Sequence, residues 1–363
     1  MTATEQPDDD VTAMLRDSLR GFLDEHWRPR GAMASSSPDE ISAIWRKLVG
    51  QGVAALGAQG DEGGLAEILV VMAELGRAGC PAPMWSAALA NLAISGSQSD
   101  VVTDLLARLH SGKAIVAFSF GALDPDRGTG SIEVAINAAT GVLRCVEAAG
   151  SATHLLVALD RAHLALIELG RPGVECVATR AMGAWGLYEI RLNAAPLTRI
   201  AGGGVDLDEL RIKGKAMLTA RAYGAARRAF ELAVDYARER HQFGQPIGKF
   251  QAIQHKLANC LIALEGVRLI LDHTARLHDG GDADWRYFAD CASAFSGSAL
   301  RQVALETQHT FGAIGYAEEH EAPIHFKRVH LDTIALGGAS DAKRRLAARL
   351  LDAGGAGLPQ YDL

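Results

Sequence analysis

The sequence has no basic run, no Lys/Arg stripe and no apolar run long enough to cross a bilayer without a charge. Its formal charge is −7 at pH 7, with both signs interspersed. Because a nucleic-acid-binding surface needs clustered positive charge, we expect no nucleic-acid partner. The polar start Met1–Asp10 also lacks the apolar core of a signal peptide. We therefore expect a cytoplasmic protein with no membrane span.

Cysteine pairs and metal-binding patterns are also missing. The cysteines have no Cys-x-x-Cys spacing, and their odd number fits reduced thiols, each expected to be a small core hydrophobe. They are Cys80, Cys145, Cys176, Cys260 and Cys291. Four late histidines also lack the i, i+4 spacing with a carboxylate of a helical zinc site, so we expect no metal. These are His309, His320, His325 and His330.

A chain of 363 residues exceeds one ordinary core, and its character changes twice. Residues 1–111 predict an all-helical domain, because apolar residues recur at helical spacing. Its helices are expected over 11–27, 41–50, 65–76, 85–94 and 101–110. Ser35–Glu40 predicts a loop and a helix cap before the second of these.

Residues 112–204 carry short β-branched or alternating runs, which predict a small antiparallel barrel or sandwich. The strands are expected over 114–120, 131–136, 142–146, 154–159, 163–169 and 187–192. Residues 205–363 predict an antiparallel four-helix bundle, because long helical patterns follow one another with short connections. Its helices are expected over 216–238, 250–277, 284–310 and 341–351.

The most informative stretch lies between the first two predicted bundle helices. The helical pattern is broken by Gly244, Pro246 and Gly248 and then resumes, which predicts an ordered loop. Arg240 and Phe243 place a guanidinium and an aromatic face at the end of a rigid helix, which suits a planar, phosphate-bearing ligand. The simpler alternative is an inter-helix turn with a surface arginine.

Three motifs in this order resemble the acyl-CoA dehydrogenase superfamily over nearly the whole chain. The resemblance implies a helical domain, a β-barrel domain and a four-helix bundle. The motifs are Gly63-Gly64 with Ala73–Ala78 and Pro81–Pro83, then Arg240–Ile247 with Phe250-Gln251, and then Phe311–Tyr316 with Glu319-His320.

The resemblance implies FAD chemistry on an acyl-CoA thioester, with electron-transfer flavoprotein as the electron acceptor. In that family the loop of one subunit reaches the FAD held mainly by another, so Arg240 would pair with the pyrophosphate and Phe243 would contact the cofactor. Further cofactor contacts would come from Gln242, from Gln308 or His309, and from the backbone at Gly312 and Ala313. Gly312 could equally be only a helix cap.

The sequence departs from the family pattern where the flavin ring and the base are expected. Ala117–Asp126 lacks the family's Thr-Glu-Pro loop, and Val142–Ser151 has no tryptophan. The catalytic glutamate's place holds Gly337, and its alternative place on the first bundle helix falls near Gly214. Glu319 is a weak candidate for the base.

Other glutamates have simpler interpretations. Glu318, Glu319 and Glu321 form a charged run that usually marks a solvated face, and Glu231 and Glu265 fit structural partners within helices.

These features favour the shorter, non-catalytic subunit of a heteromeric α2β2 acyl-CoA dehydrogenase, resembling those of bacterial steroid side-chain degradation. Such a chain would complete an interfacial FAD site with a homologous catalytic subunit. The alternatives are a self-sufficient homo-oligomeric dehydrogenase, a flavin monooxygenase of the same fold, and a structural subunit without chemistry.

Overall fold

The computed structural model describes residues 7–29, 36–60, 63–123, 130–179, 186–201, 204, 206–317 and 319–352. The chain divides into two compact units. Unit 1 lies within Met1–Arg28, Met33–Val71 and Cys80–Gly214, and unit 2 within Pro29–Ala32, Met72–Gly79 and Lys215–Leu363. The division into domains 1–111, 112–204 and 205–363 stays a prediction.

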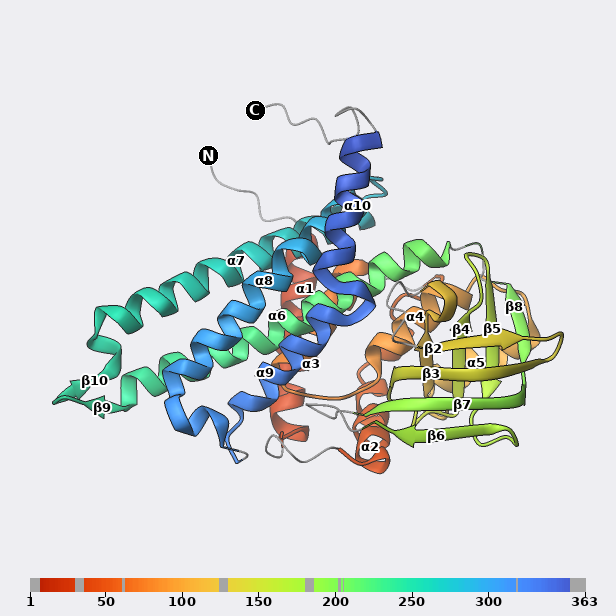
Figure 1. Ribbon diagram of the computed structural model, residues 1–363, viewed down its shortest axis with the longest axis horizontal. Helices are drawn as coiled ribbons and strands as arrows, with labels where there is room; N and C mark the ends of the chain where they lie inside the picture. Colours follow the sequence, from red (N-terminus) through yellow and green to blue (C-terminus); the bar gives the residue numbers. More distant parts are fainter. Residues whose placement is uncertain are drawn as a thin grey trace. The chain divides into compact units, whose positions relative to one another are not determined.

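The helices expected in the first third are present (Figure 1). They are α1 (Pro7–His26), α2 (Pro38–Val49), α3 (Leu65–Arg77), α4 (Met84–Ile94) and α5 (Asp100–His110), with the short 3-10 helix η1 (Val53–Ala55). The predicted cap is a capping box, in which Glu40 N donates to Ser37 Oγ and Ser37 N donates to Glu40 Oε2. Helix α4 is buried on almost every side, so its sequence is apolar all round.

The middle strands form two four-stranded sheets, with orders β1-β4-β5-β8 and β2-β3-β7-β6. Their bounds are β1 (Val116–Ser119), β2 (Gly130–Val134), β3 (Ala138–Glu147), β4 (His154–Ala158), β5 (His163–Glu168), β6 (Val174–Ala178), β7 (Leu187–Pro196) and β8 (Thr198–Ala201). Of the predicted antiparallel barrel or sandwich, a closed barrel is not formed, because the described strands of the two sheets do not pair with each other. One pairing also departs from the antiparallel prediction, since β1 runs parallel to β4. The sequence prediction also missed the short strands β6 and β8.

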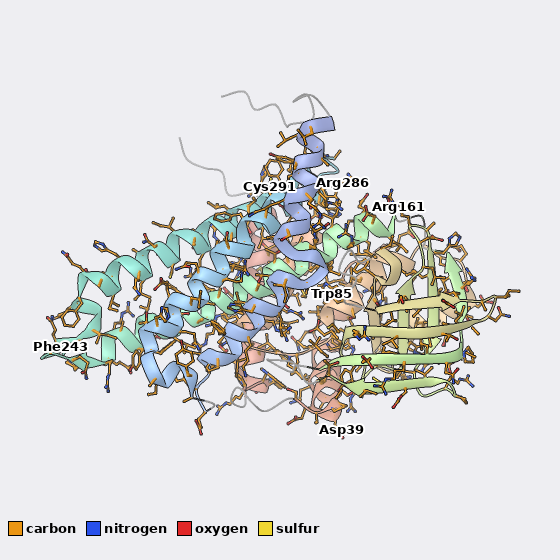
Figure 2. The ribbon with its side chains drawn as sticks, in the orientation of Figure 1. Asp39, Trp85, Arg161, Phe243, Arg286 and Cys291 are labelled. Carbon is orange, nitrogen blue, oxygen red and sulfur yellow. The ribbon has the colours of Figure 1, made fainter. Side chains whose placement is uncertain are left out.

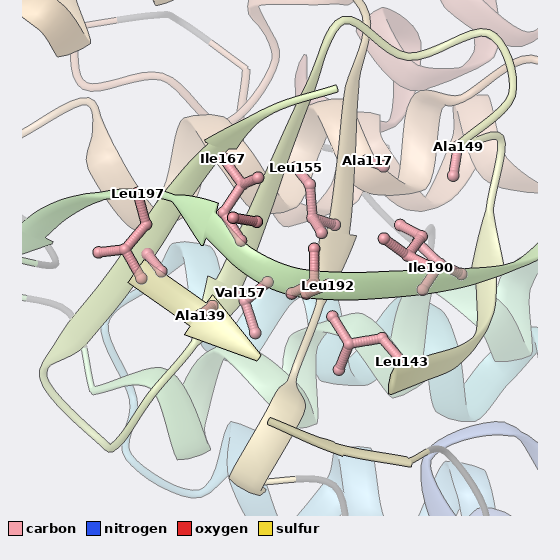
Figure 3. Packing of buried hydrophobic residues seen from close by; sticks show 13 residues of the cluster. Ala117, Ala139, Leu143, Ala149, Leu155, Val157, Ile167, Ile190, Leu192 and Leu197 are labelled. Atoms are coloured by element: carbon pink, nitrogen blue, oxygen red, sulfur yellow. The ribbon is translucent and has the colours of Figure 1, made fainter. Parts of the chain in front are cut away.

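One apolar cluster joins the two sheets, so they pack face to face as a sandwich (Figure 3). Leu155 and Ile167 contribute from the first sheet, and Leu143 and Ile190 from the second. All four are at most 1% exposed. Alternate residues of these strands face this core, because successive side chains of a β-strand point to opposite faces of the sheet.

The C-terminal helices that the structure describes are the four predicted for the bundle and one more. They are α6 (Leu207–Glu239, which begins in unit 1), α7 (Gln251–Asp279), α8 (Trp285–Phe311), α9 (Ala322–Ile334) and α10 (Gly338–Asp352), with 3-10 turns η4 (Ile247–Lys249), η5 (Gly312–Tyr316) and η6 (Ala335–Gly337). Helix α9 was not predicted. Its buried residues include His325, Arg328 and Asp332, so it lacks a clear apolar stripe.

Two glycines allow α3 and α6 to approach closely within unit 2. A Cβ added at Gly224 would lie 1.8 Å from Ala73 O, and one at Gly76 would lie 1.9 Å from Arg221 O. Side chains at these positions would force the two backbones apart. The helix that leads to the Arg240 region is therefore held against α3 by backbone contact.

The expectation that every cysteine is a buried hydrophobe is wrong for Cys145 and Cys176, whose side chains are exposed. Cys145 lies at φ 57° where the pairing of β3 with β7 shifts register, and Cys176 lies on the edge strand β6. None of the five cysteines forms a disulfide. No helix among the described residues is long and apolar enough to cross a membrane.

Candidate functional site

The predicted loop after α6 contains a small β-hairpin. The strands β9 (His241–Gln242) and β10 (Gln245–Pro246) pair antiparallel, and Phe243 and Gly244 form the turn with φ values of 52° and 80°. Two positive φ values define a turn whose twist matches the paired strands. Gly244 accepts this conformation easily, whereas a bulky aromatic residue such as Phe243 rarely does.

Phe243 lies at the tip of the hairpin and is 93% exposed (Figure 2). Its ring meets the ring of Phe250 edge-on, with the centroids 6.1 Å apart. A strained and exposed aromatic residue contributes little to the fold of an isolated chain. Its position suits contact with a ligand or a second polypeptide.

Arg240 links the end of α6 to the hairpin. Its backbone N–H donates to Tyr236 O at 2.8 Å, and its carbonyl accepts from Ile247 N at 2.8 Å. The backbone is thus fixed while the guanidinium is exposed and forms no ion pair with any residue that the structure describes. Nearby Arg238, in contrast, pairs with Asp235 at 3.5 Å. Arg240 can therefore bind an anion without first losing a partner.

The second predicted cofactor segment lies at the same end of unit 2. Phe311, the last residue of α8, packs with Tyr236 at a centroid distance of 5.4 Å, and Leu257 of α7 joins the same cluster. Tyr236 is one helical turn before Arg240, and Phe311 directly precedes Gly312. This apolar contact therefore brings the hairpin and the glycine-containing turn η5 to one end of the helices.

The structure distinguishes Gln308 from His309. Gln308 is 3% exposed, and its Nε2 donates to Gly315 O at 2.7 Å, so its amide fixes the η5 turn. The side chain of His309 is 57% exposed and lies 4.0 Å from Glu306. Of the two, His309 faces outward, where a ligand could reach it.

Gly312 and Ala313 present exposed backbone beside this turn. Gly312 has φ 64°, ends α8, and has no atom within 4 Å of an added Cβ. It is therefore a helix cap that also leaves room for a ligand to approach the backbone. Gln242 is exposed and bonds its own hairpin, since its Nε2 donates to His241 O at 2.7 Å.

The position expected for the base lies in a tight bend. Leu336, Gly337 and Gly338 have successive φ values of 53°, 78° and 49°. A Cβ on Gly338 would lie 2.3 Å from Thr333 O. A glutamate at position 337 would have to adopt a left-handed conformation, which costs an L-residue roughly 1 kcal/mol.

Charged residues surround this bend in unit 2. Lys215 of α6 forms an ion pair with Asp341 of α10, and both side chains are less than a tenth exposed. Asp332 of α9 accepts two hydrogen bonds from Arg221, from Nε at 2.8 Å and from Nη2 at 2.9 Å. The cavity beside Lys215 and Gly338 measures about 10 Å³, which is room for about one water molecule and none for an acyl chain.

The alternative base position is also closed. Gly214, in unit 1, accepts a hydrogen bond at its carbonyl from Trp85 Nε1 at 3.0 Å. A Cβ at this position would lie 3.5 Å from both Leu89 and Phe120. A carboxylate here would enter an apolar cluster, where its charge would be strongly disfavoured.

The remaining glutamates have distinct environments. Glu321 accepts hydrogen bonds from Arg228 Nε at 2.8 Å and from the buried His325 Nε2 at 2.9 Å. Burial raises the pKa of Glu321, but these two hydrogen bonds outweigh it and lower the pKa to about 2. A carboxylate whose ionised form accepts two such hydrogen bonds has a low affinity for a proton, so it is a poor base. Glu319 is exposed, and Glu318 lies outside the described residues.

Glu231 and Glu265 have the structural partners expected of them. Glu231 pairs with Arg77 at 3.1 Å, and Arg227 bridges Glu231 and Glu265 at 3.3 Å each. Among the described residues, no group of three or more His, Cys, Asp or Glu side chains is arranged to hold a metal ion.

The first segment expected at the flavin ring, in unit 1, carries mainly apolar side chains. Ala117, Phe118 and Phe120 are at most 2% exposed, and the two phenylalanine rings pack 5.1 Å apart. Ser119 Oγ accepts from Gly121 N at 3.3 Å. The described part of this segment offers no threonine hydroxyl to a ligand, and residues 124–126 lie outside the description.

Comparisons with known proteins agree with these motifs. The family "Acyl-CoA dehydrogenase, C-terminal domain" matches residues 202–351. Acyl-CoA dehydrogenase IpdE2 of Mycobacterium tuberculosis (strain ATCC 25618 / H37Rv) is 29% identical over 348 residues, covering 93% of this chain and 96% of that protein. Acyl-CoA dehydrogenase FadE34 of the same organism is 28% identical over 347 residues, covering 93% of this chain and 45% of that protein.

Solved structures show the same fold. A variant of the Tcur3481-Tcur3483 steroid ACAD has a TM-score of 0.79 at 25% identity, covering 96% of this chain and 99% of that chain. The ChsE4-ChsE5 complex from Mycobacterium tuberculosis has a TM-score of 0.77 at 23% identity, covering 99% and 100%. Residues 202–351 match the acyl-CoA dehydrogenase family, and over nearly its whole length the chain is similar to acyl-CoA dehydrogenases. Among these, it resembles the shorter subunit of heteromeric steroid acyl-CoA dehydrogenases.

The Glu321 cluster gives a pH-dependent prediction. The pKa of Glu321 in the folded protein is about 2, below its ordinary value of 4.5. Its stabilising effect is therefore fully present above pH 4.5 and disappears as the pH falls towards 2. After allowance for solvent screening, we expect Glu321→Gln to lower the free energy of unfolding at pH 7 by about 2 kcal/mol.

Urea unfolding of the parent and the variant at pH 7, 5, 4 and 3 measures this effect. The difference between the two proteins should shrink below pH 4.5. Glu319→Gln is the matched control, because Glu319 is exposed, and it should unfold like the parent at each pH. A difference that does not change with pH would contradict the assignment of the stabilisation to the Glu321 charge.

Proposed function

We propose that this chain is the non-catalytic subunit of a heteromeric, FAD-dependent acyl-CoA dehydrogenase. One observation carries the proposal: the groups suited to a neighbour's cofactor are exposed, while the place of a base holds a glycine. Arg240 and Phe243 extend outward from a fixed backbone. Gly337 instead lies in a left-handed bend beside buried ion pairs.

The residues at the hairpin end fit FAD. The guanidinium of Arg240 can form two charge-assisted hydrogen bonds to a pyrophosphate, because it forms no ion pair with the residues that the structure describes. Phe243 offers a flat apolar face, and the open space at Gly312 lets a ligand approach the backbone. When bound, FAD accepts the β-hydrogen of an acyl-CoA as hydride. This chain's residues would bind and orient the cofactor, and the base that removes the α-proton would belong to the partner.

The interior of unit 2 supports the proposal that this chain does not itself catalyse the oxidation of an acyl-CoA. A thioester and its acyl chain need an apolar pocket, but the space beside Gly338 is small and lined by Lys215, Asp332 and hydroxyl groups. Admitting a substrate would require breaking the buried Lys215–Asp341 ion pair, which is unfavourable in a low-dielectric interior.

A homologous catalytic subunit is the partner we propose, in an α2β2 complex. The steroid ACAD structure is named as a pair, Tcur3481-Tcur3483, and ChsE4-ChsE5 is named as a complex. In this chain, Ile262 and Leu269 on α7 are 71% and 54% exposed and lie two helical turns apart, as on a helix face that a partner covers. We further propose a steroid side-chain acyl-CoA as the substrate of the complex, electron-transfer flavoprotein as its acceptor, and the cytoplasm as its location.

The isolated chain gives the first test. Purified alone, it should carry far less than one FAD per chain and should not reduce a dye when given an acyl-CoA. Co-purified with its catalytic partner, the complex should show a flavin spectrum and dye reduction. If the lone chain has stoichiometric FAD and reduces the dye, it is a self-sufficient dehydrogenase, and Glu319 becomes the first candidate for its base.

Arg240→Ala tests the cofactor contact in the complex. Loss of a charge-assisted contact of roughly 1.5 to 3 kcal/mol should weaken FAD binding about 10- to 150-fold. The flavin retained after dialysis, measured by absorbance, checks this. Arg238→Ala is the matched control, because Arg238 is also exposed but pairs with Asp235. If Arg240→Ala retains as much FAD as Arg238→Ala, the proposed contact does not exist.

A further inference from the structure

One face of α8 carries buried hydroxyl groups without protein partners. Ser293 and Ser296 lie three residues apart, so they share a side of the helix. They are 7% and 1% exposed, and neither Oγ has a hydrogen-bond partner among the described residues. A buried hydroxyl left unsatisfied is destabilising, so such groups normally bond to protein or to ordered water.

Both serines line the small cavity beside the bend that follows α9. Its other walls come from α6, α9 and the start of α10, and all of them belong to unit 2. They include Lys215, Thr219 and Thr333. Thr219 Oγ1 donates to Lys215 O at 2.9 Å, and Thr333 Oγ1 donates to Val329 O at 2.7 Å. Each threonine hydroxyl therefore keeps lone pairs that can accept a hydrogen bond.

We infer that this cavity is a binding site for one ordered water molecule, held by Ser293 and Ser296. Its volume of about 10 Å³ matches the space that a single water needs, and it is too small for an organic ligand. Its polar walls offer more than the two partners that an internal water requires. The water supplies both a donor and an acceptor, which the described residues do not give these serines.

The site has a consequence for the helices around it. Gly338, where α10 begins, lines the same cavity, as do Lys215 of α6 and Asp332 of α9. A water held here lies between α6, α8, α9 and the start of α10. This inference does not depend on the proposed function, because it rests on burial and hydrogen bonding within unit 2 alone.

The melting temperature of Ser296→Ala tests the inference, because a bound water and a dry cavity predict changes in Tm of opposite sign. If water satisfies Ser296, the substitution removes a hydrogen bond and should lower Tm by roughly 2 to 4 °C. If the cavity is dry, the substitution removes an unsatisfied hydroxyl, and Tm should stay the same or rise. Ser298→Ala is the control on the same helix, because Ser298 is exposed and its Oγ donates to Phe295 O at 3.2 Å.

A high-resolution crystal structure gives a second measurement that does not depend on stability. The parent protein should show one density peak within hydrogen-bond distance of Ser296 Oγ. The double variant Ser293→Ala, Ser296→Ala should lose that peak while keeping the fold. An empty cavity in the parent, or a Tm for Ser296→Ala equal to or above that of the parent, would overturn the inference.

Discussion

The contact between Tyr236 and Phe311 positions the proposed site. Tyr236 is one turn before Arg240, and Phe311 directly precedes Gly312, so their packing sets the hairpin and the η5 turn at one end of the helices. The contact is apolar and local, yet it places a cation, an aromatic ring and an open backbone together. The rigid backbone behind Arg240 then lets an exposed side chain act with little loss of entropy on binding.

The interior of unit 2 was shaped by a different constraint. Charges buried there must be paired, and Lys215–Asp341, Arg221–Asp332 and Arg345–Asp290 meet this requirement. Such pairs fill space with polar groups that an acyl chain does not tolerate. Under the proposed function, no substrate enters this bundle, and the buried ion pairs are compatible with that proposal. The outward-facing hairpin and the polar interior therefore support the same account from different parts of unit 2.

Much of the fold could be predicted from the sequence. The features that were predicted and those that were missed differ for physical reasons. Long helices were found because their apolar periodicity is strong, whereas the cofactor role of Arg240 stays a prediction from its motif. Helix α9 was missed because ion pairs allow polar side chains to be buried in it. The hairpin was missed because nothing in the preferences of Phe243 predicts a positive φ. Which of Gln308 and His309 faces outward depends on the hydrogen bond to Gly315, which only the fold reveals.

The central claim is that the FAD served by this chain's hairpin is held by another polypeptide. Native mass spectrometry of the co-purified complex measures the ratio of FAD to chains directly. The account predicts one FAD for each pair of unlike chains, because only one of the two has a flavin cradle and a base. Two FAD molecules for each pair would show that this chain holds a cofactor of its own and would contradict the account.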